Sequence, residues 1–268
     1  MTSFAGAEAS LEDADYVVVG VPLDQTTSGA RGTGGAPRDI RLASRTMESY
    51  VPAHDVDLAG LDVHDHGDVD VWPDVEESVE YAVDVVSTLA GDALPVVLGG
   101  EHTVSLAGVE AAEPDGVVVL DAHLDLKDEF QGTRYSHACV TRRLHESGLP
   151  VAVVGARAGS REEYDYAREN HDVRVLDVAE TSPDSVHDAV DFDRPYVSVD
   201  LDVVDPGNVS VGTPEAFGLT SRETRDVVRA LAPDAVGFDV VETLPGDRGS
   251  TALAAGLVRE FVAAHSVG

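Results

Sequence analysis

The sequence predicts an α/β fold with a largely parallel sheet, and two observations support this prediction. Short runs rich in Val alternate along the whole chain with longer amphipathic stretches, which is the pattern of strands and crossover helices. The runs end in Gly, Asp, His or Glu, so polar groups follow apolar strands. The chain shows no internal repeat, no Pro- or Ser-rich linker and no break in composition, and we therefore expect a single domain over residues 1–268.

The expected elements follow the alternation in chain order. Seven apolar runs are predicted as strands, at 15–21, 95–98, 116–120, 151–154, 173–176, 196–199 and 235–240. Helices are expected between them, most clearly at 74–90, 220–231 and 250–264. The second of these opens with Thr220-Ser-Arg-Glu223, a capping box in which each side chain bonds the other residue's backbone N–H.

The charge balance excludes one class of function. The chain has 18 basic and 50 acidic side chains and a formal net charge of −32, whereas nucleic-acid binding by phosphate neutralisation needs clustered Lys and Arg. No apolar run approaches the ~20 residues of a membrane span, and the first residues lack a basic start and an apolar signal core. We expect a cytoplasmic protein that binds neither nucleic acid nor membrane.

The types of charged residue suggest that the protein works in concentrated salt. The basic residues are 17 Arg and one Lys, Lys127, against 31 Asp and 19 Glu. A dense carboxylate surface with almost no lysine resembles proteins of salt-loving archaea, in which molar cations screen self-repulsion. We predict a halophilic protein; the alternative is an acidic protein of an ordinary organism. The single cysteine, Cys139, excludes an intramolecular disulfide and a Cys-based zinc site, and is expected to be a small buried apolar residue.

Candidate functional groups follow four of the predicted strands. The carboxyl ends of strands are where open α/β sheets form their ligand crevices. The four segments are Gly99-Gly-Glu-His-Thr103, Asp121-Ala-His-Leu-Asp125, Asp200-Leu-Asp-Val-Val-Asp-Pro206 and Val241-Glu242. Carboxylates and imidazoles gathered there would repel or cost desolvation without compensating positive charge. Hard oxygen ligands mixed with two imidazoles suit manganese, and a shared carboxylate would hold two ions ~3.5–4 Å apart.

These segments resemble the signature motifs of the ureohydrolase family, which contains arginases and agmatinases. All four occur in the family's order, and Gly20-Val-Pro-Leu-Asp24 with the Gly-rich stretch 31–41 resembles the family's opening strand and loop. The resemblance covers about residues 17–264. Within the family, Ser136-His-Ala138 and the stretch 125–131 look most like archaeal agmatinases. The resemblance implies an arginase-like three-layer α/β/α sandwich with a mainly parallel central sheet, and a homo-oligomer, either a trimer or a hexamer.

The resemblance also implies roles for individual residues. One Mn2+ would be held by His102, Asp121, Asp125 and Asp200, and the other by Asp121, His123, Asp200 and Asp202. The ions would lower the pKa of a water that attacks the guanidinium carbon. Asp125 would carry a proton to the leaving amine, His137 would relay protons with solvent, and Glu242 would pair with the guanidinium.

The activity implied is hydrolysis of agmatine, a small cationic guanidino compound, to urea and putrescine. Alternatives are a hydrolase of aminopropylagmatine, an arginase, a guanidino-acid hydrolase, a formiminoglutamase, or an inactive metal-binding protein of the same fold. Asp128 and Glu129, in the loop after the Asp121 motif, either favour a cationic substrate over the α-carboxylate of arginine or are solvated surface groups.

Several other polar residues are interpreted structurally. Asp205 before Pro206 is expected to form a turn, and Glu101 to cap a helix or support a ligand. His137 has a second interpretation as a polar helix start. The His- and Asp-rich segments 54–57 and 64–68 resemble a loop of the family that carries no catalytic metal, and no apolar strand of useful length precedes His64, so we expect no ion there. The glycines at 29, 32, 34 and 35 match neither the Walker nor the dinucleotide-binding pattern.

Overall fold

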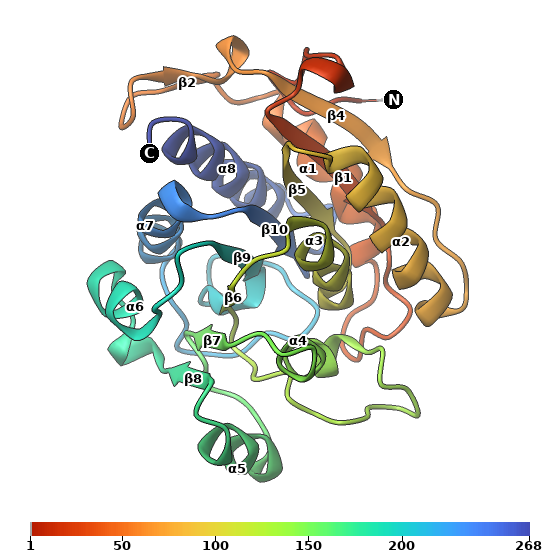
Figure 1. Cartoon of the computed structure of the whole chain (residues 1–268), viewed down its shortest axis with the longest axis vertical. Coiled ribbons are helices and arrows are strands. Elements are labelled where there is room, and N and C mark those ends of the chain that lie inside the picture. Colours follow the sequence, from red (N-terminus) through yellow and green to blue (C-terminus); the bar gives the residue numbers. More distant parts are fainter. Residues whose placement is uncertain (1) are drawn as a thin grey trace.

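The structure, a computed structural model, describes residues 2–268 and is built on an eight-stranded parallel sheet. The strand order is β4-β1-β5-β10-β9-β6-β7-β8, and each adjacent pair is parallel (Figure 1). The strands are β1 (Tyr16–Val21), β4 (Val63–Asp68), β5 (Leu94–Gly99), β6 (Gly116–Leu120), β7 (Val151–Val154), β8 (Val173–Leu176), β9 (Pro195–Asp200) and β10 (Gly237–Val241). A separate antiparallel pair consists of β2 (Tyr50–Val51) and β3 (Val56–Asp57).

Helices cover both faces of the sheet. They are α1 (Ala36–Ser44), α2 (Val75–Ala90), α3 (Ser105–Ala112), α4 (Val140–Glu146), α5 (Arg161–Glu169), α6 (Pro183–Ala189), α7 (Ser221–Leu231) and α8 (Arg248–His265). One layer contains α1, α8, α7 and α6, and the other contains α2, α3, α4 and α5. The expected three-layer sandwich is therefore confirmed. Across residues 2–268, no helix has both the length and the apolar character to cross a membrane.

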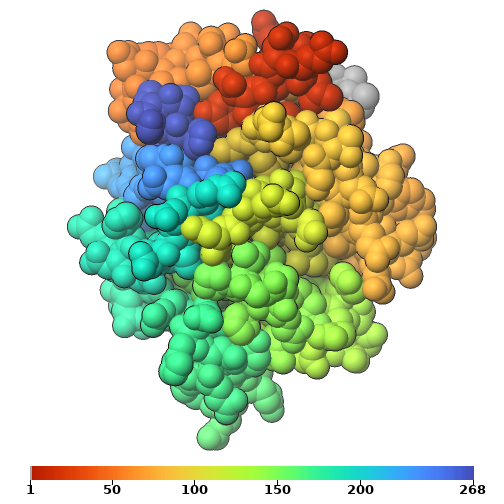
Figure 2. Space-filling model, in the orientation of Figure 1, coloured from red at the N-terminus to blue at the C-terminus, as the bar shows by residue number. Residues whose placement is uncertain are grey.

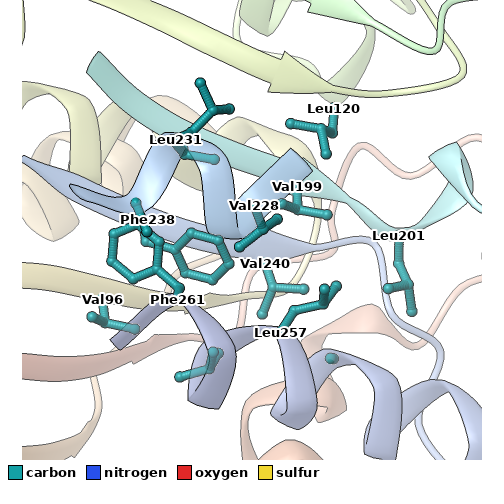
Figure 3. Close-up of a cluster of buried hydrophobic side chains, with 14 of the residues drawn as sticks. Val96, Leu120, Val199, Leu201, Val228, Leu231, Phe238, Val240, Leu257 and Phe261 are labelled. Atoms are coloured by element: carbon teal, nitrogen blue, oxygen red, sulfur yellow. The ribbon is translucent and has the colours of Figure 1, made fainter. Parts of the chain in front are cut away.

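The sheet is apolar because its central strands are buried on both faces. Every residue of β1, β5, β6, β9 and β10 is buried, which explains why these strands read as continuous apolar runs and not as alternating ones. On the α8 side, Phe238 of β10 stacks on Phe261 of α8 with ring centroids 4.4 Å apart (Figure 3). Val240 and Leu257 extend this contact along the helix.

The predicted elements are present with small shifts at their ends. All seven predicted strands and the three clearest helices form. The capping box is confirmed, since Thr220 Oγ1 accepts from Glu223 N at 3.2 Å and Glu223 Oε2 accepts from Thr220 N at 2.8 Å. Cys139 is fully buried, as expected for a small apolar residue.

The loop expected at 54–57 and 64–68 is wrong in part, because Val56–Asp57 form β3 and residues 64–68 form most of the edge strand β4, paired with β1. Strand β4 lacks the apolar run that predicted the others, because Asp65 faces inward and forms an ion pair with Arg41. Its side chain is 1% exposed, and its carboxylate accepts from Arg41 Nε and Nη2 at 2.8 Å each. Arg41 also pairs with Asp68, whose side chain is exposed, so this one residue of α1 neutralises both the buried carboxylate of Asp65 and an exposed carboxylate at the end of β4.

The N-terminal region of the chain contacts the last helix. Figure 2 shows the C-terminal residues, in dark blue, next to the N-terminal region, in red and orange, at one end of the molecule. The hydroxyl of Tyr16 in β1 lies 2.8 Å from Nδ1 of His265 at the end of α8. This contact joins the start of the sheet to the last helix.

Candidate active site

Four adjacent strands carry the predicted functional residues. The segments after β5, β10, β9 and β6 hold His102, Glu242, the Asp200–Asp202 pair and the Asp121–Asp125 segment. Because these strands are parallel neighbours, their carboxyl ends meet at one edge of the sheet. The structure thus gathers the residues predicted to form one site.

The first group of potential metal ligands surrounds the imidazole of His102. Its Nδ1 atom lies 3.1 Å from Asp121 Oδ2, 3.0 Å from Asp125 Oδ2 and 3.7 Å from Asp200 Oδ2. His102 is fully buried, and its other nitrogen, Nε2, lies 3.2 Å from Ser198 Oγ. Ser198 in turn donates to Asp239 Oδ1 at 2.7 Å, which fixes the ring so that Nδ1 faces the carboxylates.

The second group surrounds His123. Its Nδ1 atom lies 2.8 Å from Asp202 Oδ2 and 3.6 Å from Asp121 Oδ1. Asp121 therefore offers one oxygen to each histidine. Within residues 2–268, His102 with Asp121 and Asp200, and Asp121 with His123 and Asp202, are the groups of three whose ligand atoms come close enough to hold an ion.

Short backbone bonds hold these carboxylates in place. Asp121 Oδ1 accepts from His123 N at 2.6 Å, and Asp200 Oδ1 accepts from Asp202 N at 2.9 Å. Asp202 Oδ1 accepts from Ala122 N at 3.1 Å, which joins the segment after β9 to the segment after β6. The Oδ2 atoms of Asp121 and Asp200 face His102, and that of Asp202 faces His123 and also accepts from Thr213 Oγ1 at 3.2 Å.

The electrostatics of the group favour a bound cation. Burial, together with the charges of Asp202 and Asp121, holds the pKa of Asp200 well above its usual value. Burial and the charge of Asp121 likewise raise the pKa of Asp125 to about 6. Asp121 Oδ2 is buried, and its 3.1 Å contact with His102 Nδ1 does not have the geometry of a hydrogen bond. Crowded carboxylates with a spare buried oxygen, beside two imidazoles, fit divalent cations.

Two of the predicted catalytic residues have unusual backbone conformations. Asp125 has φ 49° and Glu242 has φ 57°, in the left-handed region that non-glycine residues rarely occupy. Such conformations cost of order 1–3 kcal/mol and cluster at functional sites. Glu242 comes directly after β10, and Asp125 lies in the segment that follows β6, so both turn the chain at the edge that carries the candidate ligands.

Glu242 is buried beside the first group without belonging to it. Its Oε1 atom accepts from the backbone N of His102 at 2.9 Å. Burial and the nearby charge of Glu101 hold its pKa well above the usual value. Glu242 is thus fixed next to the ligands, where a cationic group would relieve its unfavourable burial.

His137 lies among hydroxyl groups, apart from the carboxylates. Its Nε2 atom is 3.1 Å from Ser28 Oγ, and its backbone N donates to Thr26 Oγ1 at 3.0 Å. Burial and the positive charge of His102 lower its pKa to about 4, so the ring is neutral near pH 7. It also begins a short 3-10 helix, His137–Cys139, in agreement with its interpretation as a helix start.

Thr26 and Ser28 were not among the residues predicted from the sequence. They follow β1, whose carboxyl end faces the same edge as the four signature segments, and that position was the available signal. Glu101 accepts from Thr26 N at 2.7 Å and from Thr103 Oγ1 at 2.9 Å, so it supports this loop. Asp205 forms the expected turn by accepting from Gly207 N at 3.0 Å.

The loop after the Asp121 motif presents less free charge than its sequence suggests. Asp128 is 65% exposed and pairs with Arg143 at 3.0 Å and Arg134 at 3.2 Å. Lys127 pairs with the buried Glu163 at 3.2 Å. Asp128 is therefore a surface group in ion pairs, and Glu129 is also exposed.

Comparison with known proteins gives consistent results. Residues 14–264 match the model of the Arginase family. An agmatinase of Pyrococcus horikoshii is 38% identical over 89% of this chain and 86% of its own length. An N(1)-aminopropylagmatine ureohydrolase of Thermococcus kodakarensis is also 38% identical, over 86% of this chain and 83% of its own length.

The crystal structure of the agmatine ureohydrolase of Thermoplasma volcanium superimposes with a TM-score of 0.93 and 36% identity. The match covers 100% of this chain and 95% of that one. The fold, the ordered motifs and the matched length agree: the chain belongs to the arginase family.

Proposed function

We propose that this protein is an agmatinase, a hydrolase that uses two Mn2+ ions to cleave agmatine into urea and putrescine. The observation that carries the proposal is the convergence of two imidazoles, four aspartates and Glu242 at the ends of four adjacent strands. Relatives with the same kind of activity, at 38% identity, support it.

The two groups of three around His102 and His123 support two metal sites, and the proposed ligand sets add Asp125 to the first group and Asp200 to the second. His102, Asp121, Asp125 and Asp200 would hold one ion, and Asp121, His123, Asp200 and Asp202 the other, with Asp121 and Asp200 shared. Mixed carboxylate and imidazole ligands without thiolate suit manganese. When bound, the two ions would lower the pKa of a water for attack on the guanidinium carbon.

The remaining roles fall to buried side chains around this centre. Asp125, whose Oδ2 atom lies 3.0 Å from His102 Nδ1, accepts a proton and passes it to the leaving amine. Glu242 pairs with the guanidinium through charge-assisted hydrogen bonds. The neutral ring of His137, among the hydroxyls of Thr26 and Ser28, exchanges protons between this centre and solvent.

Substrate preference distinguishes an agmatinase from the alternative hydrolases. We expect a higher kcat/KM for agmatine than for arginine, because the α-carboxylate of arginine adds negative charge beside a carboxylate-rich site. A urea-release panel over agmatine, aminopropylagmatine, arginine and guanidinobutyrate, at high salt with manganese, measures it. A preference for arginine would move the assignment to arginase, and no urea from any compound would favour an inactive metal-binding protein.

Replacing Glu242 with Gln should weaken the recognition of the substrate and leave metal binding intact. In Glu242→Gln we expect kcat/KM for agmatine to fall by about a hundredfold, because a buried charged hydrogen bond to the substrate is lost. Bound manganese, measured by elemental analysis, should stay at the wild-type level. His102→Ala should instead lose manganese, and equal metal loss in both variants would contradict the role given to Glu242.

The proposal includes a homo-oligomer, either a trimer or a hexamer, in the cytoplasm. The family resemblance supports the assembly, and the charge of −32 supports a partner that is a small cation and not nucleic acid or membrane. Light scattering in molar salt measures the oligomer.

A further inference from the structure

The proposed substrate carries a second positive charge, the terminal ammonium, and the loop 127–133 leaves no buried carboxylate free to receive it. Asp128 is engaged by Arg134 and Arg143, and Glu163 by Lys127. Glu129 is exposed. A carboxylate outside this loop that lies against a candidate metal ligand is therefore a stronger candidate for receiving the ammonium.

Glu215 lies beside the nitrogen of His123 that faces away from the candidate metal ligands. The His123 ring directs Nδ1 toward Asp202 and Asp121, and its opposite nitrogen, Nε2, is 3.7 Å from Glu215 Oε1. That separation is longer than a hydrogen bond, so the carboxylate keeps its acceptor capacity. The side chain is 44% exposed, which leaves it accessible from solvent.

Arg157 fixes the backbone of Glu215 relative to the candidate ligands. Its guanidinium donates to the carbonyl oxygen of Glu215 at 2.9 Å and to that of Ala216 at 3.0 Å. The same Nη2 atom donates to the carbonyl oxygen of Asp202 at 2.7 Å. The segment that carries Glu215 is thus tied to a candidate metal ligand, and the positive charge of Arg157 is taken up by carbonyl groups.

Space remains beside this carboxylate. Glu215 lines a hollow of about 400 Å3 with Arg157, Val178 and Phe217. Phe217 has φ 65° and is 86% exposed, so its ring stands in solvent from a strained backbone. An aromatic face next to a carboxylate suits an alkylammonium group.

We propose that Glu215 binds the cationic end of the guanidino substrate and so determines the preference for a positively charged tail. This inference rests on the proposed function and adds the residue that recognises the end of the substrate remote from the reacting carbon. The interaction is an ion pair in a half-exposed position, and its contribution is moderate and salt-dependent.

The test compares agmatine with N-butylguanidine, which has the same chain length and no charge on its tail. In Glu215→Gln we expect kcat/KM for agmatine to fall about tenfold and that for N-butylguanidine to stay unchanged. Both substrates are measured at the same potassium chloride concentration, with bound manganese determined in the same samples. Glu129→Gln, which removes an exposed carboxylate of the loop 127–133, serves as the control and should alter neither substrate.

Three outcomes would overturn the inference. An unchanged ratio of the two substrates in Glu215→Gln would show that the tail lies elsewhere. An equal fall for both substrates with loss of manganese would show that Glu215 orients His123 for metal. A loss of agmatine preference in Glu129→Gln would place recognition in the loop 127–133. Failure of the wild-type protein to release urea from either compound would instead overturn the proposed function.

Discussion

Replacing Asp121 or Asp200 with Ala is expected to reduce urea release by more than about a thousandfold, because each side chain is proposed to bridge both ions. Asp121 places one oxygen beside His102 and the other beside His123. Asp200 faces His102, and burial together with repulsion by Asp202 and Asp121 holds its pKa well above the usual value. Bound metal and urea release, measured on the same preparations, should fall together.

The metal-free variants should remain folded. Removing a buried carboxylate from this crowded cluster relieves repulsion, so the melting temperature of metal-free Asp200→Ala should be at least that of the metal-free wild type. Asp205→Ala is a matched control from the same motif, because Asp205 bonds Gly207 in a turn outside both ligand groups. It should keep metal and activity. Full urea release from a thoroughly metal-stripped wild-type sample would reject the proposed mechanism.

Most of the sheet could be predicted because its strands are buried on both faces. Burial of that kind requires uninterrupted apolar residues, and β6 with Val117, Val118 and Val119 is a clear example. The edge strand β4 does not meet this condition. Its inward Asp65 is neutralised by Arg41, a partner 24 residues away, and no local pattern reports such a pairing.

The candidate site was predictable for a related reason. Parallel strands bring their carboxyl ends to one edge, so the polar residues after β5, β6, β9 and β10 could be grouped before their positions were known. The sequence did not indicate which neighbours a polar side chain would find. Asp128 pairs with Arg143, 15 residues away, and His137 contacts Ser28, 109 residues away. Such pairings depend on tertiary contacts.

The stability of the folded protein is expected to depend strongly on salt. With a net charge of −32, its carboxylates repel across distances that solvent ions must screen. The screening length is ~3 Å in 1 M salt and ~30 Å in 0.01 M salt. We expect the melting temperature to fall by roughly 10 °C or more between about 2 M and about 0.05 M potassium chloride, because lost screening destabilises the compact state by several kcal/mol.

Part of this repulsion arises between acidic side chains of helix α2. The helix contains no basic residue, and Glu76, Glu80 and Asp84 are exposed at successive spacings of four. Like charges at this spacing destabilise a helix by roughly 0.2–0.5 kcal/mol per pair, and opposite charges stabilise it by similar amounts. Glu80→Lys converts two repulsive pairs into attractive ones, so it should stabilise the protein by roughly 1 kcal/mol in dilute salt.

The salt dependence of that gain distinguishes electrostatics from packing. In molar salt the screening length is shorter than the distance between the charges of residues 76, 80 and 84. The melting temperature of Glu80→Lys should therefore be within about 1 °C of that of the wild type in molar salt. Glu80→Gln removes the repulsion without adding attraction and should give about half the gain in dilute salt. A wild-type melting temperature that is the same in dilute and molar potassium chloride would reject the halophilic interpretation. If Glu80→Lys raised the melting temperature equally in both solutions, its effect would come from packing or helix propensity. A contribution that molar salt leaves unchanged is not a repulsion between exposed charges.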